Sequence, residues 1–392
     1  MKKRLYVVFL CFFLLAGCMP LLPPQEEEQP EQVEEEQEEQ VVEAVPEVST
    51  ADRVYRSVLY DGSYMHGESR GFGSAVVYNR LDLEHLELGL QRIAMDYFDP
   101  DRYFFREGQF IKRDELNAWL MRYDAEKNPL GLNPPLAEGE TMKEREERQP
   151  RFLSHILEHN YLVQDENGQF QLGGIVIGLS LNSVYHFRVE DEQGRYHFYE
   201  VPLSDEVVEQ EGMKAAQEVV NRLRDESRED GVFQQIPIVV ALFKEQPRDA
   251  AIPGHFFAKA EAEPGQDIQK WQKINERYYL FPSSEADEEA RNEADQFQRF
   301  QDDIQTFFDS YIGVVGIGRY EDNQIQELSI DIQSSYEGKA EIVALSQYIA
   351  NQLQERFTGK YKISVVVSSV SGKTEAIIVQ NRGEEPFVHV LS

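Results

Sequence analysis

Cysteine is absent from this sequence after residue 18. The chain has 392 residues and two cysteines, Cys11 and Cys18, both near its N-terminus. A folded body that begins later therefore has no thiol nucleophile, no thiolate metal ligand and no disulfide bridge. Its stability has to come from a packed core, and the remaining chain of about 340 residues is long enough for two or three domains.

Positive charge is also scarce. The chain carries 39 lysines and arginines against 71 aspartates and glutamates, which gives a net charge of −32. Residues 19–50 hold eleven glutamates and no cation, and the chain from Ala51 onward still carries −24. Such a chain repels nucleic acid and anionic membrane surfaces. The composition argues against a nucleic-acid partner and favours basic peptides, divalent cations or neutral ligands.

Long apolar runs are confined to the N-terminus. A basic start, Met1-Lys2-Lys3-Arg4, precedes an apolar run from Leu5 to Gly17, which is too short to span a bilayer and predicts a signal peptide. The run ends in Leu15-Ala16-Gly17-Cys18, the pattern of a lipobox. We expect Cys18 to carry a diacylglyceride and a palmitate that anchor the protein at the extracytoplasmic face of the cell membrane. The alternative is an ordinary signal peptide with a chance cysteine.

The rest of the chain divides into segments of different composition. Glutamate, glutamine and proline dominate the stretch before Ala51, which cannot bury enough apolar area to fold and predicts a disordered tether. Helical periodicity marks Leu81–Phe98 and Asp114–Tyr123. The predicted organisation is a signal peptide (1–17), a lipid-anchored acidic tether (18–50), an N-terminal helical and loop unit (51–164), a first α/β repeat with linker (165–284) and a second α/β repeat (285–392).

The two repeats are predicted from a pattern that occurs twice. A glycine-bearing strand at 173–179, a helix containing Val220 and an apolar strand at 236–243 are followed by a similar series. In the second copy the strand is Gly313–Gly318, the helix contains Ile349 and the apolar strand covers 361–367. The period is too long for a solenoid. The expected fold class is α+β, with two tandem copies of a small α/β domain.

One motif has the residue types of a zinc hydrolase. His155-x-x-Glu158-His159 follows the H-x-x-E-H order, and we expect Phe152–Leu162 to form a short helix. On a helix the two imidazoles share a face and can bind zinc, while Glu158 activates water. No downstream glutamate ligand is identifiable, so we favour an ordinary surface helix and keep a zinc-dependent hydrolase as the alternative function.

A second set of side chains has the composition of a recognition patch. Two glycine-bearing loops combine aromatic rings with polar groups of both signs, which is usual at binding surfaces. The competing interpretation is that the phenylalanines are core residues that cover the Leu81–Phe98 helix. The six candidate ligand-binding residues are His66, Glu68, Arg70, Tyr103, Phe105 and Glu107.

Several strings in the sequence resemble a known family. Besides the lipobox, they lie mainly between Leu83 and Trp119 and in Asn128–Pro134. The chain resembles the CamS family of lipoproteins, known as sex pheromone precursors of Gram-positive bacteria, and the resemblance covers essentially the whole body. The most specific strings are Gly89-Leu90-Gln91, Tyr103-Phe104-Phe105, Glu107-Gly108-Gln109 and Trp119-Leu120.

The resemblance implies two functions for two parts of the chain. In the family, a short apolar peptide is cut from the end of the signal sequence. For the mature lipoprotein, the resemblance implies no enzymatic activity and no cofactor. The corresponding stretch here is Cys11–Gly17, which departs from the family's peptide by its cysteine, its adjacent phenylalanines and its final glycine. We expect a non-catalytic binding or scaffolding body whose partners are membrane lipid through Cys18 and an unknown envelope protein, peptide or glycan.

The lipobox gives the first testable prediction. Cys18→Ala removes the thiol that accepts the lipid, so cells should accumulate an unprocessed precursor that takes up no labelled palmitate. Cys11→Ala, in the same apolar run, is the matched control and should be labelled like the native chain. Normal labelling of the Cys18 variant would contradict the lipoprotein interpretation.

Overall fold

The computed structural model describes residues 43–44, 54–67, 82–307, 312–335, 338–357 and 359–391. The predicted signal peptide and Cys18 lie outside the described residues, and so do most of the tether and the candidate residues Glu68 and Arg70. Among the described helices, none combines the length and apolar character needed to cross a membrane.

The first large sheet has six strands in the order β11-β10-β9-β6-β5-β4. The central strands β6 and β9 run parallel, and the helix α4 forms the crossover between them. A parallel pair of this kind is normally covered on both faces. The elements are β4 (Tyr103–Glu107), β5 (Leu153–Gln164), β6 (Phe170–Leu181), α4 (Asp205–Leu223), β9 (Ile238–Lys244), β10 (His255–Ala262) and β11 (Trp271–Lys273).

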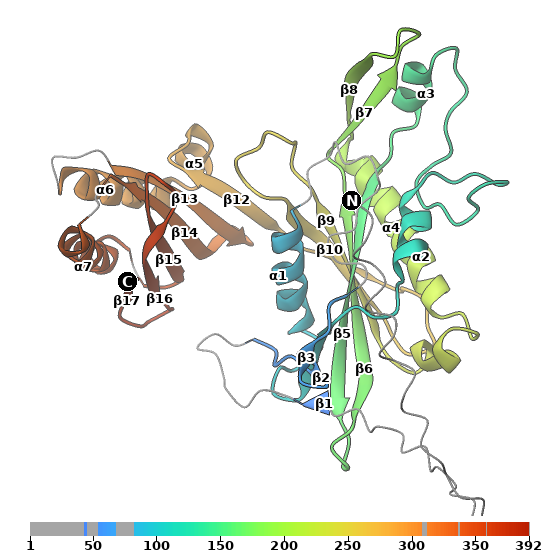
Figure 1. Ribbon diagram of the computed structural model, residues 1–392, viewed down its shortest axis with the longest axis horizontal. Coiled ribbons are helices and arrows are strands. Elements are labelled where there is room, and N and C mark those ends of the chain that lie inside the picture. Colours follow the sequence, from blue (N-terminus) through green and yellow to red (C-terminus); the bar gives the residue numbers. More distant parts are fainter. Residues whose placement is uncertain are drawn as a thin grey trace, which may run out of the picture. The chain divides into compact units, whose positions relative to one another are not determined.

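Both faces of this sheet are buried, as β9 illustrates. Its side chains alternate between two apolar clusters, with Val240 on one face and Val239 on the other. Figure 1 shows α1 (Leu83–Ala94) on one side of the sheet, with α2 (Arg113–Leu120) and α4 on the opposite side. Gly178 of β6 lets α1 approach closely, because a Cβ there would lie 2.7 Å from a methyl carbon of Leu90.

Smaller elements surround this sheet. Short strands before α1 form a three-stranded ribbon, and a separate hairpin between β6 and α4 packs against α3. These elements are β1 (Glu43–Ala44), β2 (Leu59–Tyr60), β3 (Ser63–Tyr64), α3 (Met142–Arg148), β7 (Val184–Glu190), β8 (Tyr196–Pro202) and the 3-10 helix η1 (Glu229–Gln234).

The second large sheet has its strands in the order β12-β13-β14-β15-β16-β17. The strands β14 and β15 are parallel and joined through α7, while the other pairs are antiparallel. Figure 1 shows α6 and α7 together on one side of this sheet. The elements are β12 (Glu276–Phe281), α5 (Ser284–Glu289), α6 (Arg291–Thr306), β13 (Ile312–Glu321), β14 (Gln324–Ser334), α7 (Lys339–Arg356), β15 (Lys362–Ser369), β16 (Thr374–Gln380) and β17 (Phe387–Val390).

Only the helix-covered face of the second sheet is deeply buried. Along β13, Val314 is buried in the core whereas its neighbour Val315 is 45% exposed. Along β14, Leu328, Ile330 and Ile332 are buried, and Ser329 and Asp331 between them are exposed. This alternation is typical of a strand with one covered face.

The two sheets repeat one topology, and the α+β fold class is confirmed. Strands β4, β5, β6, β9, β10 and β11 follow each other in space as β12 to β17 do, and each sheet has one parallel pair joined by a helix. The first copy differs by the inserted β7–β8 hairpin and by α1, which covers its second face.

Two details of the prediction are wrong. Residues 152–162 are not a helix, because Leu153–Gln164 is the strand β5. The boundary drawn between residues 164 and 165 separates β5 from β6, which pair along their lengths, so the segment 51–164 contributes strands to the first repeat. Consequently the strand at Gly313–Gly318 corresponds to β5 and not to residues 173–179.

The shared core generates the second prediction. Val220 of α4 and Ile349 of α7, the crossover helices of the two repeats, are both fully buried. Replacing either residue by alanine should lower the free energy of unfolding by about 2–4 kcal/mol, because each change leaves a cavity under a crossover helix. Urea titration of the purified chain measures this change in the free energy of unfolding. The exposed Val207 and Val343 on the same helices are the controls, and their alanine variants should change stability by less than about 0.5 kcal/mol.

Candidate functional site

Glu107, the last residue of β4, holds the segment that contains His66. The Tyr64 hydroxyl and the Gly67 backbone N–H each donate a hydrogen bond of 2.7 Å to its carboxylate. The His66 Nδ1 lies 3.9 Å from Glu107 Oε1, and the carbonyl of His66 accepts a hydrogen bond from Gln109. The structure therefore brings His66 and Glu107 together, although Glu107 itself is buried.

The aromatic members of the predicted patch have a different role. Phe105 is buried against α1 and meets the ring of His159 edge to face, with the ring centroids 4.9 Å apart. Tyr103 is half-buried and packs beside Phe98, 5.1 Å between centroids. The assignment of Phe105 to a binding surface is wrong, since its side chain has the core role that we gave as the alternative.

The H-x-x-E-H motif does not have zincin geometry, because it lies on the strand β5. Alternating side chains place His159 with Leu157 on the α1 face, whereas Glu158 joins Ile156 on the α2 and α4 face. His155 and His159 are separated by roughly 13 Å along the strand, too far for one ion whose bonds to nitrogen are about 2 Å. Across the residues that the structure describes, no group of three or more His, Cys, Asp or Glu side chains is placed to hold a metal.

Glu158 is fully buried and organises the loop that follows β4. Its carboxylate accepts hydrogen bonds from the backbone N–H groups of Gln109, Phe110 and Ile111, at distances between 2.7 and 3.2 Å. The Asn160 side-chain amide donates another, at 2.6 Å. Both carboxylate oxygens are therefore used, and the loop before α2 is held against β5.

Burial raises the pKa of the Glu158 carboxyl, and the hydrogen bonds to its charged form, foremost that from Ile111, counteract this in part. A folded-state pKa above the unfolded value means that the folded protein binds the proton more tightly. This carboxyl therefore contributes stability at low pH, and the contribution is lost as the pH rises through the raised pKa.

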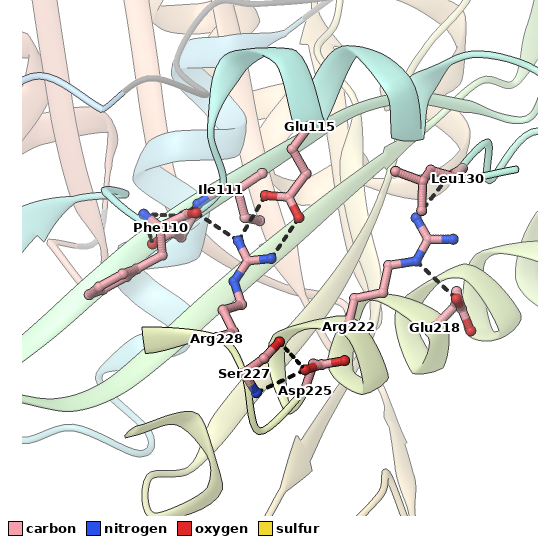
Figure 2. Close-up of polar contacts among 10 residues, drawn as sticks. Phe110, Ile111, Glu115, Leu130, Glu218, Arg222, Asp225, Ser227 and Arg228 are labelled. Atoms are coloured by element: carbon pink, nitrogen blue, oxygen red, sulfur yellow. Dashed lines mark hydrogen bonds and ion pairs between the residues drawn. The ribbon is translucent and has the colours of Figure 1, made fainter. Parts of the chain in front are cut away.

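Arg228, from the loop after α4, approaches the same loop from the other side. Figure 2 shows its guanidinium between the carboxylate of Glu115 and the carbonyl of Phe110, with distances of 2.6, 2.8 and 2.7 Å. Arg224 is buried nearby and donates to the backbone carbonyls of Phe233, Ala262 and Glu263. Sequence reasoning missed these arginines, because Arg228 and Glu115 are 113 residues apart.

A groove of about 320 Å³ lies beside α4. Tyr123, Leu132 and Phe152 are among its apolar lining residues, and Lys214 and Glu218 add charges. Arg222 fixes one wall, since it donates to Glu218 and to the Leu130 carbonyl, as Figure 2 shows. The mixture of apolar and charged groups suits recognition of a peptide or protein segment.

Comparisons with known proteins agree on one family. A family model described as CamS sex pheromone cAM373 precursor matches residues 64–386. The chain is similar to the crystal structure of a sex pheromone precursor from Lactobacillus salivarius subsp. salivarius, with 27% identity, a TM-score of 0.79, and coverage of 90% of this chain and 99% of that one. No curated protein matches.

A second solved structure is the C-terminal domain of a sex pheromone precursor from Staphylococcus aureus. It is 30% identical, with a TM-score of 0.68, and the alignment covers 80% of this chain and 98% of that domain.

The third prediction concerns Glu158. Glu158→Gln keeps the size of the side chain but turns one hydrogen-bond acceptor into a donor that faces backbone N–H groups. The free energy of unfolding at pH 7 should fall by about 1–3 kcal/mol, measured by urea titration. The matched control is Glu209→Gln, since Glu209 makes a surface pair with Lys273 at 3.8 Å, and it should change stability by less than about 0.5 kcal/mol. Equal stability of the two variants would contradict the role of Glu158.

Proposed function

Because the chain belongs to the CamS family of sex pheromone precursors, we propose that it is a lipoprotein anchored through Cys18 outside the cytoplasmic membrane. Its folded body is a non-catalytic binding or scaffolding module of the cell envelope. The sequence features that support the anchor are the lipobox Leu15–Cys18 and the acidic, cation-free stretch that separates it from the body.

One observation carries the non-catalytic part of this proposal. Two buried carboxylates of the first repeat, Glu107 beside His66 and Glu158 within the H-x-x-E-H motif, both hold backbone segments in place. A general base needs a lone pair directed at a substrate proton, whereas these oxygens accept N–H donors of the chain itself. Their arrangement supports a structural role.

The body offers recognition surfaces instead. The groove beside α4 combines apolar and charged side chains from three segments, and Arg222 fixes its shape. In the first repeat this groove is the candidate contact for an envelope protein or peptide. A fixed wall supports binding because little side-chain freedom remains to be lost when a partner arrives.

The signal fragment has a separate role in the proposal. The related chains from Lactobacillus salivarius and Staphylococcus aureus are described as sex pheromone precursors. By analogy the segment before Cys18 would be the released peptide, Cys11–Gly17 in this chain. Its two adjacent phenylalanines and its cysteine set its chemistry apart from that of the family's peptide.

The fourth prediction tests the location of the body. Intact cells are treated with a membrane-impermeant amine-reactive biotin, and the chain should be recovered biotinylated in the membrane fraction. A variant that lacks residues 2–17 should stay unlabelled, as should an internal cytoplasmic protein. Recovery of the native chain from the cytosol without label would overturn the proposal.

A further inference from the structure

The second repeat has an open hollow where the first repeat is filled by its own chain. This C-terminal hollow, of about 690 Å³, lies between the start of α6, the β13–β14 turn, the end of the α7–β15 loop and the β16–β17 turn. Its lining comprises Asn292, Glu293, Asp295, Gln296, Arg299, Asn323, Gln324, Ile325, Gln326, Lys360, Tyr361 and Arg382. The volume is in the range of small-molecule sites.

In the first repeat the corresponding segments meet each other. The topology makes α2 the counterpart of α6, the α4–β9 loop the counterpart of the α7–β15 loop, and the β10–β11 loop that of the β16–β17 turn. There, Arg228 of the α4–β9 loop binds Glu115 of α2, as Figure 2 shows, and Arg224 binds the carbonyl of Glu263 in the β10–β11 loop. The chain itself supplies the oxygens that these guanidinium groups need.

In the second repeat the cations at this place have no such oxygens. The side chains of Arg299, Lys360 and Arg382 make no hydrogen bond or ion pair with another residue in the described part of the chain. With Glu293 and Asp295 in the same lining, the hollow carries one net positive charge in a chain of −32. An oxyanion is the group that satisfies such a cluster, and arginine binds one through two parallel hydrogen bonds.

A buried hydroxyl points to the same ligand. The Tyr361 side chain lines the hollow and is 5% exposed, yet its hydroxyl makes no hydrogen bond to another described residue. Buried polar atoms are normally satisfied, so an acceptor from outside the chain fits here. Burial, and to a lesser extent the charge of Glu293, raise the pKa of Tyr361, so the hydroxyl keeps its proton and can act as a donor.

The remaining polar lining suits hydroxyl groups. Asn292, Gln296, Asn323 and Gln326 each present an amide that both donates and accepts hydrogen bonds. We propose that the C-terminal hollow binds a hydroxyl-rich ligand that carries an oxyanion, that is, an acidic oligosaccharide or a polyol phosphate. Arg299, Lys360 and Arg382 hold the carboxylate or phosphate, Tyr361 donates to a ligand oxygen, and the amides bind the hydroxyl groups.

This inference deepens the proposed binding role. It rests on that proposal in one respect only, namely that the ligand comes from the cell envelope. The binding itself follows from the lining and holds whether or not Cys18 is lipidated. The test therefore uses the purified full-length mature chain in solution, and its failure would leave the anchoring proposal untouched.

The fifth prediction is measured by isothermal titration calorimetry. Trigalacturonic acid supplies the carboxylate and glycerol 3-phosphate the phosphate, with galactotriose and glycerol as uncharged counterparts. At least one acidic probe should bind with a Kd of about 1 mM or lower, and its uncharged counterpart at least about tenfold more weakly. The acid that binds more tightly shows whether the oxyanion of the ligand is a carboxylate or a phosphate.

Variants locate the site. The triple change Arg299→Gln, Lys360→Gln and Arg382→Gln should weaken binding at least about tenfold, and Tyr361→Phe about fivefold without loss of folding. The matched control changes the exposed Lys127, Arg248 and Lys270 to glutamine, which alters the net charge equally, and should shift the Kd less than about twofold. Equal weakening in both triple variants, equal affinity for charged and uncharged probes, or no binding of either acid would overturn the proposal.

Discussion

The first repeat depends on a carboxylate that has no contact with solvent. Glu158 lies in the middle of β5, and its oxygens hold the backbone of residues 109–111. Arg228 then binds the Phe110 carbonyl from the opposite side, and Glu115 fixes Arg228. A buried charge is tolerated only where donors surround it. Strand β5, helix α2 and the loop after α4 are thereby joined around one buried carboxyl group, and its hydrogen bonds have a directional specificity that apolar contacts lack.

The duplicated topology shows how one fold accepts two kinds of strand. In the first repeat α1 covers the second face of the sheet, and β6 and β9 are apolar almost throughout. In the second repeat no such helix exists in the described residues, and the side chains of β13 and β14 alternate between buried and more exposed positions. The strand order is unaffected, because it is set by the crossover helices and the hairpins between neighbouring strands. The copies differ instead at the end of the sheet, where the first binds Arg224 and Arg228 with oxygens of its own chain and the second leaves Arg299 and Arg382 exposed.

Sequence patterns predicted the parts of the fold that have a clear period. The helices α1, α4 and α7 and the strands β9 and β15 were found because amphipathic stripes or compact apolar runs mark them.

Strand β5 was mistaken for a helix, since burial on both faces removes the alternation that identifies a strand, and its histidines happen to be four residues apart. The structure places His66 near Glu107 and gives Phe105 the core role that was the alternative for the phenylalanines, while ligand binding at this patch remains a prediction. Pairs such as Arg228 and Glu115 leave no local signal, because only the tertiary fold brings them together. The predictions for Cys18, Glu68 and Arg70 concern residues outside the described part and remain predictions.

The covering of the first sheet on both faces also affects how the two copies can acquire new surface during evolution. A strand enclosed on both sides offers no position at which a side chain can change freely, so substitution alone cannot create an exposed patch there. A strand enclosed on one side offers every second position. The first copy can therefore gain surface mainly by insertion, and the hairpin Val184–Pro202, with Phe198 66% exposed, is such an addition. The second copy can diverge by point substitution along its open face, with its length and topology unchanged.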